Sequence, residues 1–201
     1  MRNLLMIGSL TLFGCMAYSQ TDGLMAFADP KVNISLAANE SSSSEINNPS
    51  EQAWLFIEQG LQYDKSNNLE EALKAFDKAI KINDTIADAW DFRAVTNIKM
   101  GKYRRALRDL QEAIELNPGL ADAYNHAGIA NYWLCNYSNA IAFYSKAIEM
   151  KPGYSTPYFN RAIVYLTLDE KGKAHKDLLK AKELGSEGVD KVLNDFFADK
   201  K

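Results

Sequence analysis

Histidine, serine and cysteine side chains are the groups in this sequence that could serve as bases, nucleophiles or metal ligands. The two histidines, His126 and His175, are far apart in the chain, and neither has a serine or cysteine nucleophile at the spacing that a triad needs. Two histidines one helical turn apart, or paired Cys-x-x-Cys motifs, are absent from the sequence. The sequence therefore predicts a protein that is not an enzyme and that uses no metal and no cofactor.

A short basic run is the second group of residues with chemical potential. It consists of Lys102, Arg104, Arg105 and Arg108. Two of these arginines have an acid four residues later, Asp109 and Glu112, at the spacing that pairs opposite charges on a helix. We therefore expect surface ion pairs here. The net charge of −3 also argues against nucleic acid as a partner, since such surfaces need an excess of Lys and Arg.

The first nineteen residues have the features of a secretory signal peptide. Arg2 gives a positive start, an apolar run extends from Leu4 to Met16, and small residues lie just before Gln20. The run is shorter than the ~20 apolar residues that span a bilayer. We expect residues 1–19 to be removed and the chain to be exported, so that it is periplasmic or secreted.

An alternative fate of the leader involves its cysteine. The stretch Leu12-Phe13-Gly14-Cys15 resembles a bacterial lipobox, in which Cys15 would be lipidated and become the new N-terminus. Acyl chains would then tether the protein to a membrane surface. The likeness also makes a bacterial source the expected one, and the sequence leaves cleavage and lipidation open.

Residues 20–48 are expected to form a flexible linker. The run from Ser41 to Ser44 lies among Asn and Glu residues, has no helical or strand periodicity, and offers little apolar surface to offset ordering. Leu24 to Phe27 and Val32 to Leu36 are more apolar, which leaves a short docking peptide as the alternative to a plain spacer.

From Ala53 to Gly188 the sequence repeats itself every 34 residues, in units 53–86, 87–120, 121–154 and 155–188. Two antiparallel helices approach closely only where side chains are small and bulky neighbours fill the gaps beside the contact. Large apolar residues recur at the twenty-fourth position, as Phe76, Leu110, Tyr144 and Leu178. Small residues recur at the eighth position (Gly60, Ala94, Gly128, Ala162), the twentieth (Ala72, Ala106, Ala140, Ala174) and the twenty-seventh (Ala79, Ala113, Ala147, Ala181). The pattern predicts an all-α fold of four helix-turn-helix units within residues 49–186.

Several signals mark where these helices begin and end. Asn48, Pro49 and Glu51 supply a cap, a first-turn proline and an acid three residues after the cap, so the first helix should begin near Pro49. Pro118-Gly119 and Pro152-Gly153 should separate successive units, because proline cannot extend a helix and glycine tolerates a positive φ.

The last segment, residues 187–201, is expected to be a capping helix. Val189, Val192 and Phe196 share one face, and charged residues occupy the other. The final unit of a stack leaves an apolar face that an amphipathic helix can cover. Recruitment of a partner helix by the same face is the alternative.

The four units resemble tetratricopeptide repeats. The resemblance rests on the small eighth, twentieth and twenty-seventh positions of all four units, together with Pro118 and Pro152 at the thirty-second position. It implies a right-handed superhelical solenoid of helix pairs, whose first helices line a concave groove for peptides or partner domains. It implies no catalytic chemistry.

The resemblance also implies which residues line that groove. In the family they occupy the second, fifth, sixth, ninth, twelfth and thirteenth positions of each unit. Phe92, Trp133 and Phe159 are the expected anchors, because aromatic rings add contact area at little rotamer cost. The aspartates would favour a partner with Lys or Arg, and a solubilising face is the alternative. The expected partner-binding residues are Asp88, Asp91, Phe92, Val95, Asp122, Asn125, His126, Trp133, Phe159 and Asn160.

One use of the family is a clamp in which Lys, Asn and Arg hold the C-terminal carboxylate of a chaperone. The stretch from Tyr158 to Ala162 resembles one part of that clamp. The positions that should supply its cations hold Ile57, Asp122 and His126 instead. Carboxylate capture by that route is therefore not expected.

The sequence thus predicts an exported, non-enzymatic module that binds a peptide or partner protein, basic or apolar in character, in a groove. The alternative is an envelope assembly factor or structural scaffold subunit, lipid-anchored at Cys15, that acts by oligomerisation through its convex surface or through Phe196 and Phe197. Membrane association is expected only in the lipidated form.

Overall fold

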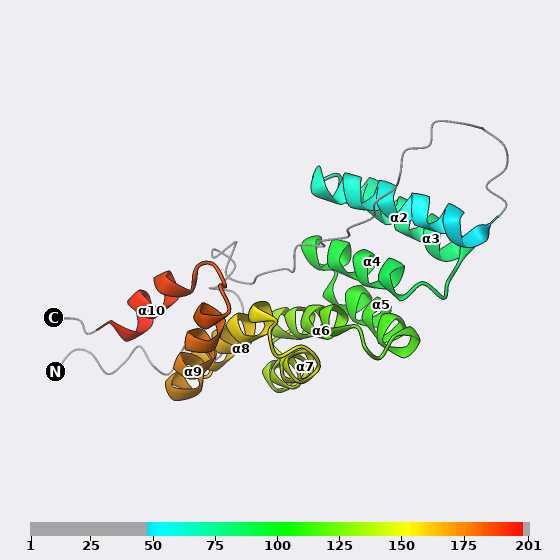
Figure 1. The fold of residues 1–201 in the computed structure, drawn as a ribbon. Helices are drawn as coiled ribbons and strands as arrows, with labels where there is room; N and C mark the ends of the chain where they lie inside the picture. The colour runs from blue at the N-terminus through cyan, green and yellow to red at the C-terminus, as the bar shows by residue number, and fades with distance from the viewer. Residues whose placement is uncertain (1–47, 199–201) are drawn as a thin grey trace. The chain divides into compact units, whose positions relative to one another are not determined.

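The computed structural model describes residues 48–198, which form nine α-helices and no β-strand (Figure 1). These residues divide into two compact bodies, with the boundary between Leu120 and Ala121. The expected signal peptide 1–19, Cys15 and all of the expected linker except Asn48 lie outside the described residues.

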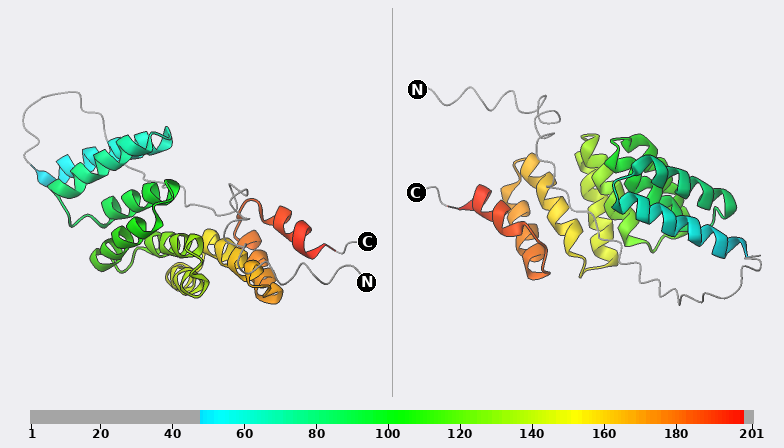
Figure 2. Two further views of the ribbon diagram at one scale, coloured as in Figure 1. Left: turned by 180° about the vertical axis from the view of Figure 1, so that it is seen from behind. Right: turned by 90° about the horizontal axis from the view of Figure 1, so that it is seen from above.

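Each body is built from helix pairs. In every pair a turn of three residues reverses the chain, so that the two helices lie side by side (Figures 1 and 2). The first body contains α2 (Pro49–Lys65), α3 (Leu69–Ile82), α4 (Ala87–Lys99) and α5 (Tyr103–Leu116). The second contains α6 (Ala121–Trp133), α7 (Tyr137–Met150), α8 (Ser155–Thr167), α9 (Lys171–Glu183) and α10 (Val189–Phe197). These bounds confirm the all-α fold class, with helix pairs in the predicted register and a C-terminal helix.

The start of α2 follows the predicted cap, with one difference. Asn48 accepts a hydrogen bond on its side chain from the backbone N–H of Ser50, at 3.0 Å, and Pro49 is the first helical residue. Glu51 does not reach the backbone amide of the cap. Its carboxylate instead accepts from the side-chain amide of Asn48, at 3.5 Å.

The turn inside each pair uses a left-handed residue at the fifteenth position of the unit. These residues are Asn67, Gly101, Cys135 and Asp169, with φ between 57° and 71°. The N–H of the next residue then donates to the carbonyl five residues back, as from Asn68 to Tyr63 at 2.8 Å, which satisfies carbonyls at the helix end. Only one of the four turns uses the glycine that this conformation favours.

The prolines between units lie outside the helices, as predicted, because α5 ends at Leu116 and α7 ends at Met150. The expected role of the glycines beside them is wrong. Neither Gly119 nor Gly153 adopts a positive φ. The first of these turns is held instead by Asn117, whose side-chain oxygen accepts from the N–H of Gly119 at 3.0 Å.

Small residues occupy the contact between the helices of a pair. The alanines at the twentieth and twenty-seventh positions are all fully buried. At the eighth position the contact has two forms. Gly60 faces the ring of Phe76, where an added Cβ would lie 2.5 Å from Cε1, and Gly128 faces Tyr144 in the same way. Burial raises the pKa of Tyr144 well above its usual value, so this phenol stays neutral.

The other two units use a different match at the same place. There alanine takes the eighth position and leucine the twenty-fourth, in the pairs Ala94 with Leu110 and Ala162 with Leu178, all of them buried. The chain thus alternates between glycine opposite an aromatic ring and alanine opposite leucine. Each combination fills a similar space between two helices.

A partly buried ion pair accompanies the alanine form. Arg93 holds Asp109 through two hydrogen bonds, of 3.0 and 2.8 Å, and its third group reaches Asp77 on the preceding pair at 2.6 Å. Burial lowers the pKa of Arg93, but the hydrogen bonds and charges of both aspartates outweigh it, and the net pKa is raised. The guanidinium also lies 4.8 Å from the ring of Trp90.

The fourth unit repeats this arrangement. Arg161 holds Asp177 at 2.7 and 2.9 Å and donates to Ser145 of the preceding pair at 2.8 Å. Burial again lowers the pKa of Arg161 and the hydrogen bond to Asp177 raises it, with a raised net value. These two forks link the helices of one pair and also tie that pair to the pair before it.

The expected pairing on α5 is wrong. Asp109 is buried and bound by Arg93, so it is not available to Arg105. No ion pair joins Arg108 to Glu112 within residues 48–198 either.

Helix α10 packs on α9 through Val189 and Val192, which are both buried (Figure 2). Its Asp190 pairs with Lys182 of α9 at 2.6 Å, and the ring of Phe197 lies 4.8 Å from that of His175. Phe196 remains 43% exposed. The helix thus covers an apolar side of α9 and leaves one aromatic ring on the surface.

The glycine–aromatic match can be tested at Gly128. Gly128→Ala should destabilise the protein by roughly 1–3 kcal/mol, because the new methyl group overlaps the Tyr144 ring. Adding Tyr144→Leu, which copies the match of units two and four, should recover most of that loss. Equilibrium denaturation measures both.

The matched control is Gly172→Ala in α9, where an added Cβ would meet no atom within 4 Å. It should be neutral or stabilise by up to ~1 kcal/mol. If Gly128→Ala behaves like this control, close packing does not explain the glycine.

Candidate peptide-binding site

In the first body, the facing first helices α2 and α4 share a polar cluster. Asp64, near the end of α2, accepts a hydrogen bond from the hydroxyl of Thr96 at 3.2 Å and forms an ion pair with Lys99. The Lys99 side chain is 32% exposed and that of Asp64 is 16% exposed. The pair is therefore partly accessible from solvent.

The four predicted partner residues of the first body all lie on α4 but differ in access. Asp88, Phe92 and Val95 are half-buried, whereas Asp91 is only 3% exposed. Phe92 packs against the core of the first pair, with its ring 6.1 Å from that of Phe76. Much of its surface therefore stabilises the fold.

In the second body, α6 and α8 position the other six predicted residues. Asp122 and Trp133 are half-buried, and Trp133 makes an edge contact with Tyr132 at 5.6 Å. His126 and Phe159 are both only 4% exposed. Phe159 thus offers almost no surface in this structure, whereas Trp133 at the end of α6 retains a surface that a partner can contact.

The fifth position of the unit is buried in every copy. Its residues are Ile57, Asp91, Asn125 and Phe159. Ile57 belongs to the apolar core of the first pair, together with Phe76. A position that the resemblance places on the groove is thus inaccessible in this structure, in both bodies.

Two asparagines meet between α6 and α8. The side-chain amide of Asn160 donates to the side-chain oxygen of Asn125 at 3.2 Å, and both residues are fully buried. The Nδ2 of Asn125 has no hydrogen-bond acceptor within the described part of the chain. A buried amide donor left in this way costs about 1–3 kcal/mol.

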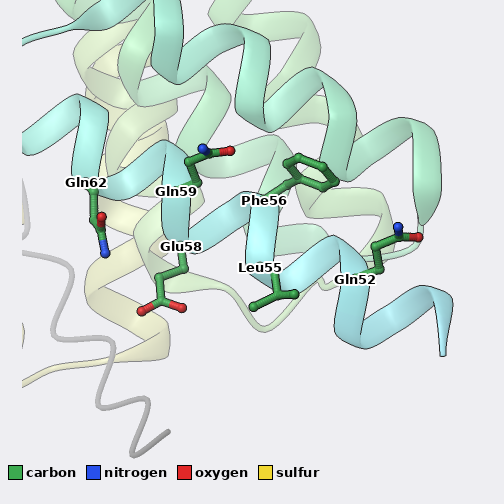
Figure 3. Close-up of a pocket in the computed structure, with 6 residues that line it drawn as sticks. All are labelled: Gln52, Leu55, Phe56, Glu58, Gln59 and Gln62. Atoms are coloured by element: carbon green, nitrogen blue, oxygen red, sulfur yellow. The ribbon is translucent and has the colours of Figure 1, made fainter. Parts of the chain in front are cut away.

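A surface hollow of about 550 Å³ lies on α2 (Figure 3). Leu55 in this hollow is 45% exposed, whereas Ala89, at the same position of the second unit, is buried in the core of the first pair. The hollow is therefore the side of α2 on which a preceding pair would pack. None of the ten predicted partner residues lines it; its described lining is Gln52, Leu55, Phe56, Glu58, Gln59 and Gln62.

The described part of the chain was predicted to hold no metal, and its histidines lie on two different helices. Residues 48–198 contain no group of three or more His, Cys, Asp or Glu side chains that could hold a metal ion. His126 is buried on α6, and His175 is exposed on α9 beside Phe197. Among the described helices, none has the length and apolar character needed to cross a bilayer.

Sequence reasoning missed two features of this surface. Asn125 and Asn160 were each predicted to bind a partner, but the hydrogen bond between them was not predicted. Their separation of one residue more than the repeat length was the signal in the sequence. The cluster of Asp64, Thr96 and Lys99 has a similar signal, since its members are spaced by about one repeat.

The asparagine pair predicts energetic coupling. Asn125→Ala and Asn160→Ala should each destabilise the protein by roughly 1–2 kcal/mol, and the double variant by less than the sum, with a coupling of about 0.5–1.5 kcal/mol. Urea denaturation of the four proteins measures this. Asn117→Ala, in the other body, serves as the control and should add to Asn160→Ala independently; additivity of the first pair would contradict a shared hydrogen bond.

Two family models described as tetratricopeptide repeat match the chain, over residues 56–85 and 93–155. No curated protein matches it. Among solved structures, the crystal structure of MamA is 26% identical, covers 68% of this chain and 80% of its own, and has a TM-score of 0.62.

Two further solved structures show the same fold at lower identity. TTC0263, a thermophilic tetratricopeptide-repeat protein of Thermus thermophilus, is 23% identical over 66% of this chain and 74% of its own, with a TM-score of 0.62. The second tetratricopeptide-repeat domain of human RPAP3, in complex with the HSP70 peptide SGPTIEEVD, is 22% identical over 58% of this chain and 98% of its own, with a TM-score of 0.56. Together with the repeated helix pairs, these matches identify the chain as a tetratricopeptide-repeat protein.

Proposed function

We propose that this chain is an exported, non-enzymatic interaction module that binds an extended peptide segment of a partner protein along α6 and α8. Proteins of this fold serve in protein–protein interaction, and the RPAP3 domain was solved with a bound peptide. The site proposed here lies on one body, at Trp133 near the end of α6.

The half-buried ring of Trp133 at the end of α6 is the observation that carries the proposal. An aromatic side chain adds a large contact area with little rotamer entropy to lose, so a partly accessible tryptophan can anchor a peptide. Asn125 and Asn160 are fully buried and would hold α6 against α8 behind this surface rather than touch the peptide. Binding would therefore depend on one aromatic anchor.

The charge of this surface defines the partner further. Asp122 on α6 contributes a half-buried carboxylate to it. The HSP70 peptide bound by human RPAP3 carries acids near its end. In this chain Asp122 occupies a position where a carboxylate clamp has a cation. A carboxylate at this position favours a ligand that carries Lys or Arg among apolar residues.

This proposal predicts that one aromatic ring controls affinity. Random peptides displayed on phage and selected on the full chain should be enriched in basic and apolar residues. Trp133→Ala should weaken a selected peptide by about tenfold or more, because it removes the central contact. Fluorescence anisotropy measures Kd.

Phe196→Ala is the matched control, since it removes an exposed ring from α10 and should leave Kd unchanged. Peptides that bind equally well after Trp133→Ala would place the binding surface elsewhere.

The second candidate function is a lipid-anchored assembly factor that acts by oligomerisation. It is favoured by two exposed apolar side chains near the C-terminal end, Phe196 at 43% and Leu179 at 48%. Its anchor would be Cys15, which lies outside the described residues.

Mass spectrometry of the mature protein separates the two candidates. We expect a chain that begins at Gln20, because small residues precede it at the leader cleavage point. A chain that begins at Cys15 and carries the added mass of acyl groups would contradict export by simple cleavage and support the anchored form.

A further inference from the structure

An unpaired arginine cluster covers the start of α5. Arg104, Arg105 and Arg108 are all exposed and lie within its first two turns. Within residues 48–198 none of them forms an ion pair. Two nearby acids already have other partners: Asp109 is bound by Arg93, and Glu70 pairs with Lys102 at 3.6 Å. Three guanidinium groups on one helix are thus left to solvent.

The use of arginine in this chain is selective. The sequence has six arginines against seventeen lysines, and Arg2 belongs to the leader. Arg93 and Arg161 each hold an aspartate through two hydrogen bonds. The remaining three are those of the cluster. In the described helices, two arginines thus bind a carboxylate through two guanidinium N–H groups, and the other three have guanidinium groups that could bind a carboxylate in the same way.

The position of the cluster is unfavourable for α5 itself. The N-terminus of a helix carries a partial positive charge, which acids stabilise and cations destabilise. The other helices of this body begin with acids, namely Glu51 in α2, Glu70 and Glu71 in α3, and Asp88 in α4. Helix α5 has no acid in its first turn and no side-chain cap from Lys102. A feature that lowers stability without a compensating internal contact is typical of a binding surface.

The surroundings limit the shape of the ligand. Exposed carboxylates lie near the cluster, with Glu112 and Glu115 further along α5 and Glu70 of α3 beside Lys102. A broad anionic plane such as a membrane would be repelled by these acids when it approached the arginines. A narrow acidic chain can follow the arginines alone.

We propose that the arginine cluster of α5 binds an Asp- or Glu-rich segment of a partner polypeptide, whose carboxylates occupy the open guanidinium forks. This surface lies in the first body and differs in charge from the α6 and α8 surface. The two proposals are independent, and failure of one leaves the other intact.

The test uses the full chain and a fluorescein-labelled oligoglutamate peptide, followed by anisotropy at near-physiological salt. Reversing two charges, with Arg104→Glu and Arg105→Glu, should raise Kd by at least about 30-fold. The same variant should melt roughly 2–6 °C higher, because it places acids at the helix N-terminus. A role of these arginines in folding would instead lower the melting temperature.

Two further variants complete the design. Arg104→Lys with Arg105→Lys keeps the charge but removes the fork, and should raise Kd by about 3–10-fold. Lys176→Glu, on α9 at the position that corresponds to Arg108, is the matched control and should change Kd less than about twofold.

Three results would overturn the proposal. The first is no binding of oligoglutamate by the unchanged chain, and the second is an equal loss in Lys176→Glu. The third is that the unchanged chain binds phosphatidylglycerol vesicles but not oligoglutamate, and that the double charge reversal abolishes vesicle binding. This result would assign the cluster to a membrane surface.

Discussion

The residue at the eighth position of each unit lies opposite the residue at the twenty-fourth. The combined volume of these two residues must fill the space between the two helix backbones. Glycine opposite Phe76 or Tyr144 and alanine opposite Leu110 or Leu178 satisfy this condition in two ways. The buried alanines further along each pair then keep the helices close over their length. This contact sets how closely the two helices of each pair lie.

Most of the fold could be predicted from the sequence, because the features that determine it are local or periodic. The 34-residue repeat, the cap at Asn48 and the prolines at 118 and 152 each act within a few residues or recur at a fixed interval. The left-handed turns at Asn67, Cys135 and Asp169 could not be predicted in the same way. Their conformation is imposed by the reversal of the chain between two packed helices, whatever the residue type.

The site was harder to predict because burial depends on neighbours that a single unit does not contain. Phe159 was expected to be an accessible anchor and is nearly inaccessible in the structure, and the expected bond between Arg105 and Asp109 is replaced by one from Arg93. Both differences concern side chains whose partners lie on another helix. Residue type and spacing along one helix gave no signal for them, whereas comparison of equivalent positions across units would have paired Arg93 with Asp109.

The arginine forks have a consequence for how such a chain lengthens in evolution. Arg93 donates to Asp77 and Arg161 donates to Ser145, each on the second helix of the preceding unit. The first contact lies within the first body and the second within the second body. Odd and even units are therefore complementary rather than interchangeable. Tandem duplication would preserve these contacts if it copied an odd and an even unit together, whereas insertion of a single unit would set two helices of the same kind beside each other.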